Sequence, residues 1–265
     1  MAEAETISPW GPPSPPAPTP PAGPSRLQNF IWGALSTLLL AAWISWQMGW
    51  LWGVAAVFGV FVHEYGHVLV INWAGCGPSQ IRIIPFFGGA ATMQRPPDTE
   101  FKGVLIALAG PVFGMLATLP FFGLSAVTGD PSWQSGAFVI AAINLLNLAP
   151  APPLDGAKAL GPILARINPA LERIALFAVG AFAVAWTFSR GSIILPVFIS
   201  LSLLVSLRAA RLRMPAAPLT WTEWWVGLVF YLGAVAICAA IAAIAAVGAG
   251  ISLHIFSFGS IGGLK

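Results

Sequence analysis

The distribution of apolar residues constrains this chain more than any other feature. Of its 265 residues, 57% are hydrophobic and only 8% are charged, whereas about a quarter of the residues in an ordinary soluble domain are charged. An apolar helix of about 20 residues can cross the hydrocarbon core of a bilayer. The sequence predicts seven such spans, at 28–47, 51–73, 102–127, 133–150, 171–188, 191–208 and 223–249. The expected fold class is therefore an all-α polytopic membrane protein.

The count of seven depends on the fifth and sixth spans. Both are short, and only Arg190 and Gly191 separate them, so a single broken or re-entrant pair, giving six spans, stays open. The first 25 residues contain nine of the 24 prolines and predict a disordered, Pro-rich tail over residues 1–27.

The basic residues predict an orientation. With a cytoplasmic N-terminus, ten of the twelve Lys and Arg fall on the cytoplasmic side, leaving only Arg190 and Lys265 outside. Such a bias follows the positive-inside rule. We therefore expect a multi-pass protein of a bacterial cytoplasmic (inner) membrane with its N-terminus inside the cell. The net charge of +3 bears on orientation and does not indicate a nucleic-acid partner.

The second span contains the sequence His63-Glu64-Tyr65-Gly66-His67. Residues four apart share a helix face, so both imidazoles can point at one metal ion with Glu64 alongside. This is the HExxH pattern of zinc hydrolases. One acid at the centre of a membrane helix costs about 2.5 to 3.5 kcal/mol on insertion scales, so Glu64 needs partners, which a bound cation would supply. The alternative is a hydrogen-bonded polar cluster that holds helices together.

A third metal ligand is expected, because catalytic zinc usually takes three protein ligands and keeps a fourth position for water. The sequence offers Asp98, Asp130 and Asp155 as Asp ligands. The second and fourth spans both run from outside to inside, so Asp155 arrives at the depth of His67. The prolines before Asp155 break the helix and free backbone groups to line a cavity. A helix-capping turn with a solvated Asp155 is the alternative.

The HExxH sequence together with Asn147-Leu148-Ala149-Pro150-Ala151-Pro152-Pro153-Leu154-Asp155-Gly156 resembles the site-2 protease family of intramembrane zinc metalloproteases. That family pairs HExxH with NxxPxPxxDG, and the resemblance covers residues 50–158. It implies one zinc ion per chain, a catalytic acid/base, and an Asn that positions substrate or supports the oxyanion. The residues in these roles would be His63, His67 and Asp155 as ligands, Glu64 as acid/base, and Asn147. Residues 109–114 are similar to the family's Gly-Pro segment, and we interpret Gly114 as a packing residue.

Residues 81–94 predict a short β-hairpin, because Gly88-Gly89 separates two β-prone runs. The resemblance implies a re-entrant hairpin beside the active site, and an open strand edge there could hold an extended substrate through main-chain hydrogen bonds. Gly88, Gly89 and Thr92 are therefore candidate substrate-binding residues. A cytoplasmic surface loop is the alternative.

The resulting division of the chain is a tail (1–27), a first transmembrane helix (28–48), a catalytic core (49–158) and C-terminal transmembrane helices (159–265). The short loops predict a compact family member without a PDZ or CBS domain. The expected function is hydrolysis of peptide bonds within or near transmembrane segments, with a transmembrane protein as substrate and a regulatory membrane partner. A metal-ion transporter that uses the His/Glu/Asp cluster as its transport site is one alternative, and an inactive relative that only binds membrane segments is another.

Overall fold

The computed structural model of the chain describes residues 26–84, 88–151, 153–189, 200 and 216–251. The predicted Pro-rich tail, apart from its last two residues, lies outside this described part. So does the predicted sixth span at 191–208, apart from residue 200, together with Arg190 and Lys265.

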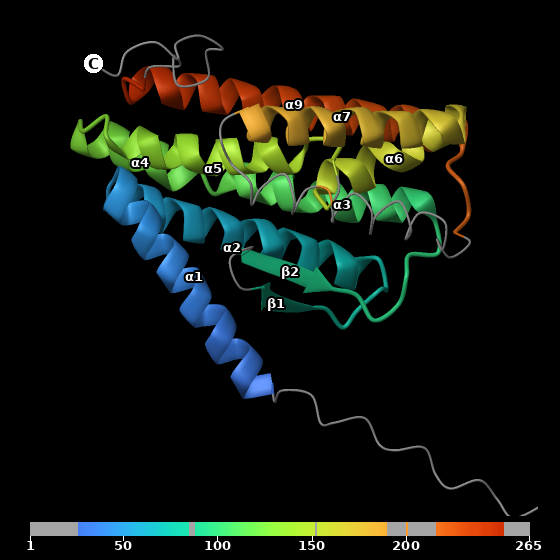
Figure 1. Cartoon of the computed structure of the whole chain (residues 1–265), viewed down its shortest axis with the longest axis horizontal. Coiled ribbons are helices and arrows are strands. Elements are labelled where there is room, and N and C mark those ends of the chain that lie inside the picture. Colours follow the sequence, from blue (N-terminus) through green and yellow to red (C-terminus); the bar gives the residue numbers. More distant parts are fainter. Residues whose placement is uncertain (1–25, 85–87, 152, 190–199, 201–215, 252–265) are drawn as a thin grey trace, which may run out of the picture.

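Helices make up most of the described chain, in agreement with the predicted helical membrane fold. The elements are α1 (Arg26–Met48), α2 (Trp50–Trp73), β1 (Gln80–Ile84), β2 (Gly88–Thr92), α3 (Glu100–Leu116), α4 (Leu119–Thr128), α5 (Trp133–Asn147), α6 (Asp155–Ile167), α7 (Pro169–Ser189) and α9 (Trp221–Gly248). In Figure 1, α7 and α9 lie along one side of the bundle and α2 along the other, with α3 and α5 between them. Helix α1 diverges from α2 at an angle, and the two strands lie beside the second half of α2.

Three helical stretches of the described residues are long and apolar enough to cross a membrane, namely Trp50–Trp73, Glu100–Thr128 and Trp221–Gly248. Each begins close to the start of a predicted span. The prediction of seven spans is neither confirmed nor contradicted, because part of the chain lies outside the described residues.

The predicted span at 102–127 is interrupted between α3 and α4. Helix α3 ends at Leu116 and α4 begins at Leu119, with Pro120 in its first turn. Proline has no N–H to continue the ladder of the preceding helix but is tolerated in a first turn. The hydroxyl of Thr118 donates to the carbonyl of Met115 at 2.6 Å and so satisfies an acceptor at the break.

The sequence interpretation missed helix α6, which has a strongly polar face and an apolar face. The indole Nε1 of Trp224 donates to the carbonyl of Ile163 at 2.8 Å. The guanidinium of Arg166 lies 4.7 Å from the centre of the Trp221 ring. These contacts join α6 to the start of α9, and the boundary drawn at 158 falls inside α6.

The hairpin exists, but its turn is not at the glycines. The strands pair antiparallel with Gln80 opposite Thr92, and Gly89 and Gly88 lie within β2 opposite Ile83 and Ile84. The prediction that the Gly-Gly pair separates the two strands was therefore wrong. Strand β1 ends directly before Pro85, and proline cannot donate a ladder hydrogen bond. The connection, residues 85–87, lies outside the described part of the chain.

Candidate metal centre

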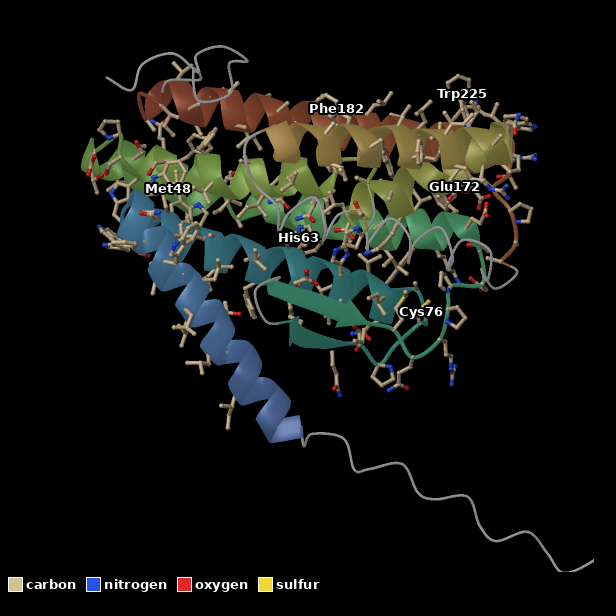
Figure 2. The ribbon with its side chains drawn as sticks, in the orientation of Figure 1. Met48, His63, Cys76, Glu172, Phe182 and Trp225 are labelled. Carbon is tan, nitrogen blue, oxygen red and sulfur yellow. The ribbon has the colours of Figure 1, made fainter. Side chains whose placement is uncertain are left out.

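Three donor groups from two distant parts of the sequence meet inside the bundle. His63 and His67 project from α2, and Asp155 begins α6 after the break that follows α5. The Nε2 atoms of the two imidazoles are 3.2 Å apart, and each is 3.0 Å from Oδ2 of Asp155. All three residues are buried, and Figure 2 shows His63 well inside the bundle. The structure thus brings together the three residues predicted as metal ligands.

This donor set fits a tetrahedral metal ion. Zinc ligands at 2.0 to 2.1 Å from the ion would stand about 3.3 Å from one another, close to the three separations observed. Two imidazole nitrogens and one carboxylate oxygen also form a ligand set that is typical of catalytic zinc. The side chains therefore suit a metal that retains one open coordination position.

The other nitrogen of each imidazole has its own hydrogen-bond partner. His63 Nδ1 is 2.8 Å from Oδ1 of Asn144, and His67 Nδ1 is 2.7 Å from the carbonyl of Ile106. Both partners are acceptors, so each Nδ1 carries a proton and each Nε2 keeps its lone pair. Such outer partners fix the tautomer and the ring orientation of metal-binding histidines. The site is thus arranged for metal binding on its Nε2 side.

Asn144 is a site residue that the sequence interpretation missed. It is fully buried, and its Nδ2 donates to the carbonyl of Ile140 at 2.7 Å, which fixes the amide so that Oδ1 faces His63. Asn147, the residue of the motif, lies one turn later, and its Nδ2 donates to the carbonyl of Ile143 within its own helix. The available signal was a second Asn at helical spacing in an otherwise apolar span. The substrate-binding role of Asn147 stays a prediction.

Two glycines of α3 make room for this arrangement. A Cβ at Gly110 would stand 2.4 Å from Nε2 of His67 and 2.6 Å from Nε2 of His63. A Cβ at Gly114 would collide with the side-chain amide of Asn144. The two residues are four apart and share a helix face. Gly114 is therefore a packing residue, as predicted, but the group against which it packs is the one that orients His63.

Asp155 is held by its own helix, and the end of α5 that precedes it is anchored to α9. Its Oδ1 accepts from Nζ of Lys158 at 2.9 Å, so the two carboxylate oxygens have different partners. The hydroxyl of Tyr231 donates to the carbonyl of Leu148 at 2.7 Å, where α5 ends. The ammonium group of Lys158 beside Oδ1 stabilises a negative charge on Asp155. The carboxylate form, which a metal needs, is thereby favoured.

Glu64 lies beside the donor cluster but bonds in another direction. Its side chain is buried, and its Oε2 accepts from the backbone N–H of Ala91 in β2 at 3.0 Å. Glu64 is not part of the group of three donors that could hold a metal. This placement puts a carboxylate beside the donor cluster without making it one of the three donors.

Part of the chain is similar to known proteins. Residues 34–152 match the family described as peptidase M50B-like. The matched region is thus similar to M50B-like peptidases and contains His63, Glu64 and His67.

Two curated relatives match part of the chain. A Synechocystis sp. protein named "Putative zinc metalloprotease sll0528" is 30% identical over 131 residues, which cover 46% of this chain and 34% of that protein. A Mycolicibacterium smegmatis protein named "Putative zinc metalloprotease Rip2" is 32% identical over 114 residues, covering 40% of this chain and 39% of that protein. The matched segments thus span little more than a third of either relative's length.

The predicted substrate-binding residues Gly88, Gly89 and Thr92 lie on β2. Thr92 Oγ1 donates to the carbonyl of Gln80 at 3.1 Å, across the hairpin. Gly88 and Gly89 belong to the same strand, and Ala91, between Gly89 and Thr92, contacts Glu64. The strand is therefore next to the acid/base candidate, while binding of a substrate to it stays a prediction.

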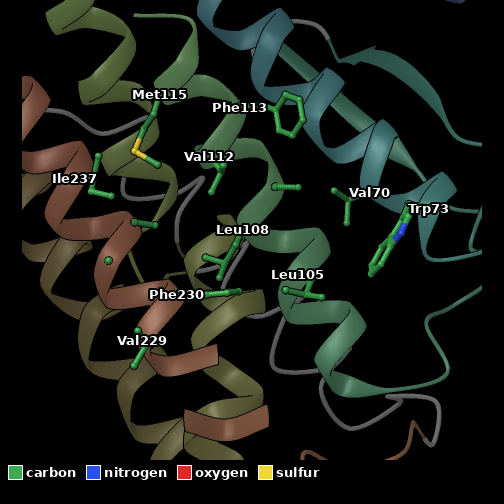
Figure 3. Close-up of a pocket in the computed structure, with 13 residues that line it drawn as sticks. Val70, Trp73, Leu105, Leu108, Val112, Phe113, Met115, Val229, Phe230 and Ile237 are labelled. Atoms are coloured by element: carbon green, nitrogen blue, oxygen red, sulfur yellow. The ribbon is translucent and has the colours of Figure 1, made fainter. Parts of the chain in front are cut away.

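An apolar groove of about 590 Å³ lies between α2, α3 and α9 (Figure 3). Its lining includes Val70 and Trp73 of α2, Leu105 and Val112 of α3, and Phe230 of α9. Ala109 lines this groove, whereas the adjacent Gly110 faces the two histidines. The groove is lined by residues that cannot carry out acid–base chemistry, so we place the reaction at the buried cluster on the other face of α3.

Proposed function

We propose that the chain is an intramembrane zinc metalloprotease that hydrolyses peptide bonds within or near transmembrane segments of membrane-anchored proteins. The observation that carries this proposal is the convergence of two Nε2 atoms and one carboxylate oxygen within 3.2 Å of one another on apolar helices, with Glu64 beside them. The M50B-like match supports it. One zinc ion per chain would be held by His63, His67 and Asp155.

When bound there, zinc would make a water molecule acidic enough to lose a proton near neutral pH and would polarise the scissile carbonyl. Glu64 accepts that proton and later delivers it to the leaving amine. No covalent bond forms between the enzyme and the substrate. Asn144 and the carbonyl of Ile106 keep the imidazoles in the required tautomer throughout. Asn147 is assigned to positioning of the substrate or of its oxyanion.

The substrate must be extended where it is cut, because the carbonyls of an intact helix are hydrogen-bonded and shielded. An extended segment in an apolar site needs hydrogen-bond partners for its amides and carbonyls. Strand β2, which contains Gly88, Gly89 and Thr92, is close enough to Glu64 to offer them by strand addition through the main-chain groups on its outer edge. The two strands are accordingly assigned as a re-entrant hairpin beside the active site.

The proposed topology has seven transmembrane helices, a cytoplasmic N-terminus and an active site in the cytoplasmic half of a bacterial inner membrane. Trp46, Trp50 and Trp133 would mark the outer interface, and Trp73, Trp221 and Trp224 the inner one. Trp50 and Trp133 are in edge-to-face contact, with ring centres 5.9 Å apart, which supports a common depth for them. Cysteines introduced at Ser25 and Ala216 should not react with an impermeant thiol reagent added outside intact cells. Labelling of either cysteine would contradict this topology.

Incubation of purified protein in detergent with a membrane-segment substrate tests the proposed activity. We expect cleavage that stops when a chelator removes the metal and returns when zinc is restored. The Glu64→Gln variant, purified identically, should bind zinc and leave the substrate intact. Zinc binding without cleavage by the native protein would favour the transporter or an inactive, segment-binding relative, and uptake of metal into sealed vesicles would then identify the transporter.

A further inference from the structure

The contact between Ala91 and Glu64 joins the hairpin to the proposed acid/base. The backbone N–H of Ala91 donates to Oε2 of Glu64 at 3.0 Å. The donor is a main-chain group and the acceptor is a buried side chain on another element. The substitution of one side chain for another at position 91 would therefore preserve this contact, provided that the strand keeps its place.

The direction of this N–H follows from the pairing of the strands. In an antiparallel ladder, successive residues point their N–H and C=O groups alternately toward the partner strand and away from it. Because the Ala91 N–H bonds to Glu64, it points away from Ile81, its partner on β1. The amides of Ala90 and Thr92 then face β1, so Ala91 presents its amide at the outer edge of β2.

The strand is anchored on both sides of this contact. The side chain of Ala91 packs against a buried cluster of Ile71, Cys76 and Ile106, and the carbonyl of Ile106 accepts from His67. Just beyond β2, the amides of Gln94 and Arg95 both donate to the carbonyl of Cys76, at 3.0 and 3.2 Å. The Ala91 amide therefore has a fixed position relative to α2 and to the metal-binding imidazoles.

We propose that Ala91 is a positioning residue whose backbone N–H holds one oxygen of Glu64 and directs the other toward the reacting water. This inference rests on the proposed protease function. A carboxylate on three rotatable bonds loses activity when it samples several orientations, since proton transfer requires it within hydrogen-bond reach of the water. The edge amide at Ala91 is thus assigned to the enzyme's own acid/base, and a substrate strand that adds to β2 would use the other outward-facing groups, at Gly89.

Proline at position 91 tests this role, because it removes the N–H that faces Glu64 and leaves the ladder bonds of Ala90 and Thr92 in place. Hydrogen bonds to charged groups are strong, so we expect Ala91→Pro to lower kcat about ten- to a hundredfold, with KM and zinc content unchanged. Ala91→Gly keeps the N–H, so its kcat should stay close to that of the native protein. Ala90→Pro, which removes an amide that faces β1, should instead raise KM by disturbing the hairpin.

Two kinetic results would contradict a positioning role for the Ala91 amide. A rise in KM at constant kcat in Ala91→Pro would assign the amide to substrate binding, and equal losses in Ala91→Pro and Ala91→Gly would assign the effect to side-chain packing. Either result overturns the inference.

Hydrogen–deuterium exchange of the purified zinc-loaded protein tests the hydrogen bond between the Ala91 amide and Glu64 without reference to activity. In Glu64→Ala, exchange of the Ala91 amide should speed up at least about tenfold relative to that of Ala90. Unchanged exchange at Ala91 would refute the proposed contact. If the native protein cleaves no substrate but this amide responds, the contact stands and the protease function fails.

Discussion

The two histidines and the glutamate of HExxH lie within two turns of one helix, but two different regions of the protein fix their side chains. His63 and His67 are fixed inside the bundle by Asn144 of α5 and by the carbonyl of Ile106 in α3. Glu64 is fixed by the backbone of a two-stranded hairpin. The comparison teaches that the proposed metal ligands and the proposed acid/base depend on separate supports. Substitutions in the bundle interior should affect the metal, and substitutions in the hairpin should affect turnover.

The largest effect is expected at Gly110, since a Cβ there would stand 2.4 and 2.6 Å from the two Nε2 atoms. Gly110→Ala should lower zinc affinity at least about a hundredfold, because the imidazoles must move away from the third ligand. Gly103 provides a matched control on the same helix, because a Cβ there would meet its nearest neighbour at an ordinary 3.7 Å. Competition with a chelator measures both affinities, and equal affinities in the two variants would contradict the assigned geometry.

The helical fold and the cluster of His63, His67 and Asp155 could be predicted from the sequence because their signals are local or repeated. Apolar runs predicted α2 and α9, and the His-x-x-x-His spacing needs only helical geometry. The depth of Asp155 followed from the direction of two spans. These features do not depend on atomic packing.

The partners of those residues could not be predicted, because they are set by packing between distant segments. The acceptor for His67 is a backbone carbonyl, and the donor to Glu64 is a backbone amide, so no residue type marks either one. The hairpin register depends on where β1 stops, and Gly88-Gly89 wrongly suggested the turn. The register also determines the role of the Thr92 amide, which faces β1. A proline there would damage the hairpin rather than remove a donor from its outer edge.

A second prediction separates the two asparagines of α5. Asn144→Ala removes the acceptor of the His63 N–H and should lower zinc affinity about ten- to a hundredfold, as loss of an outer partner usually does. Asn147→Ala should retain zinc and lower cleavage, because Asn147 bonds only within its own helix among the described contacts. Thermal unfolding of both variants controls for loss of structure. If Asn147→Ala loses zinc and Asn144→Ala does not, the roles assigned to the two asparagines are wrong.

The smallest effect is expected at Lys158, which is mostly exposed although its partner Asp155 is buried. Lys158→Met frees Oδ1 of the carboxylate and should weaken zinc binding by no more than about fivefold, as for other exposed ion pairs. Lys102 forms a pair of the same 2.9 Å length with the exposed Asp98. Lys102→Met should leave zinc affinity unchanged. A larger effect at Lys102 than at Lys158 would mean that the Asp155 pair does not support the site.

The most direct test of the central claim is the zinc content of two variants, measured together with their cleavage of a membrane-segment substrate. Asp155→Ala removes a ligand and should lose both zinc and activity. Glu64→Gln removes the acid/base but no ligand, so it should keep one zinc per chain and lose activity. Zinc loss in Glu64→Gln, or cleavage by it at the native rate, would contradict the separation of metal binding from proton transfer.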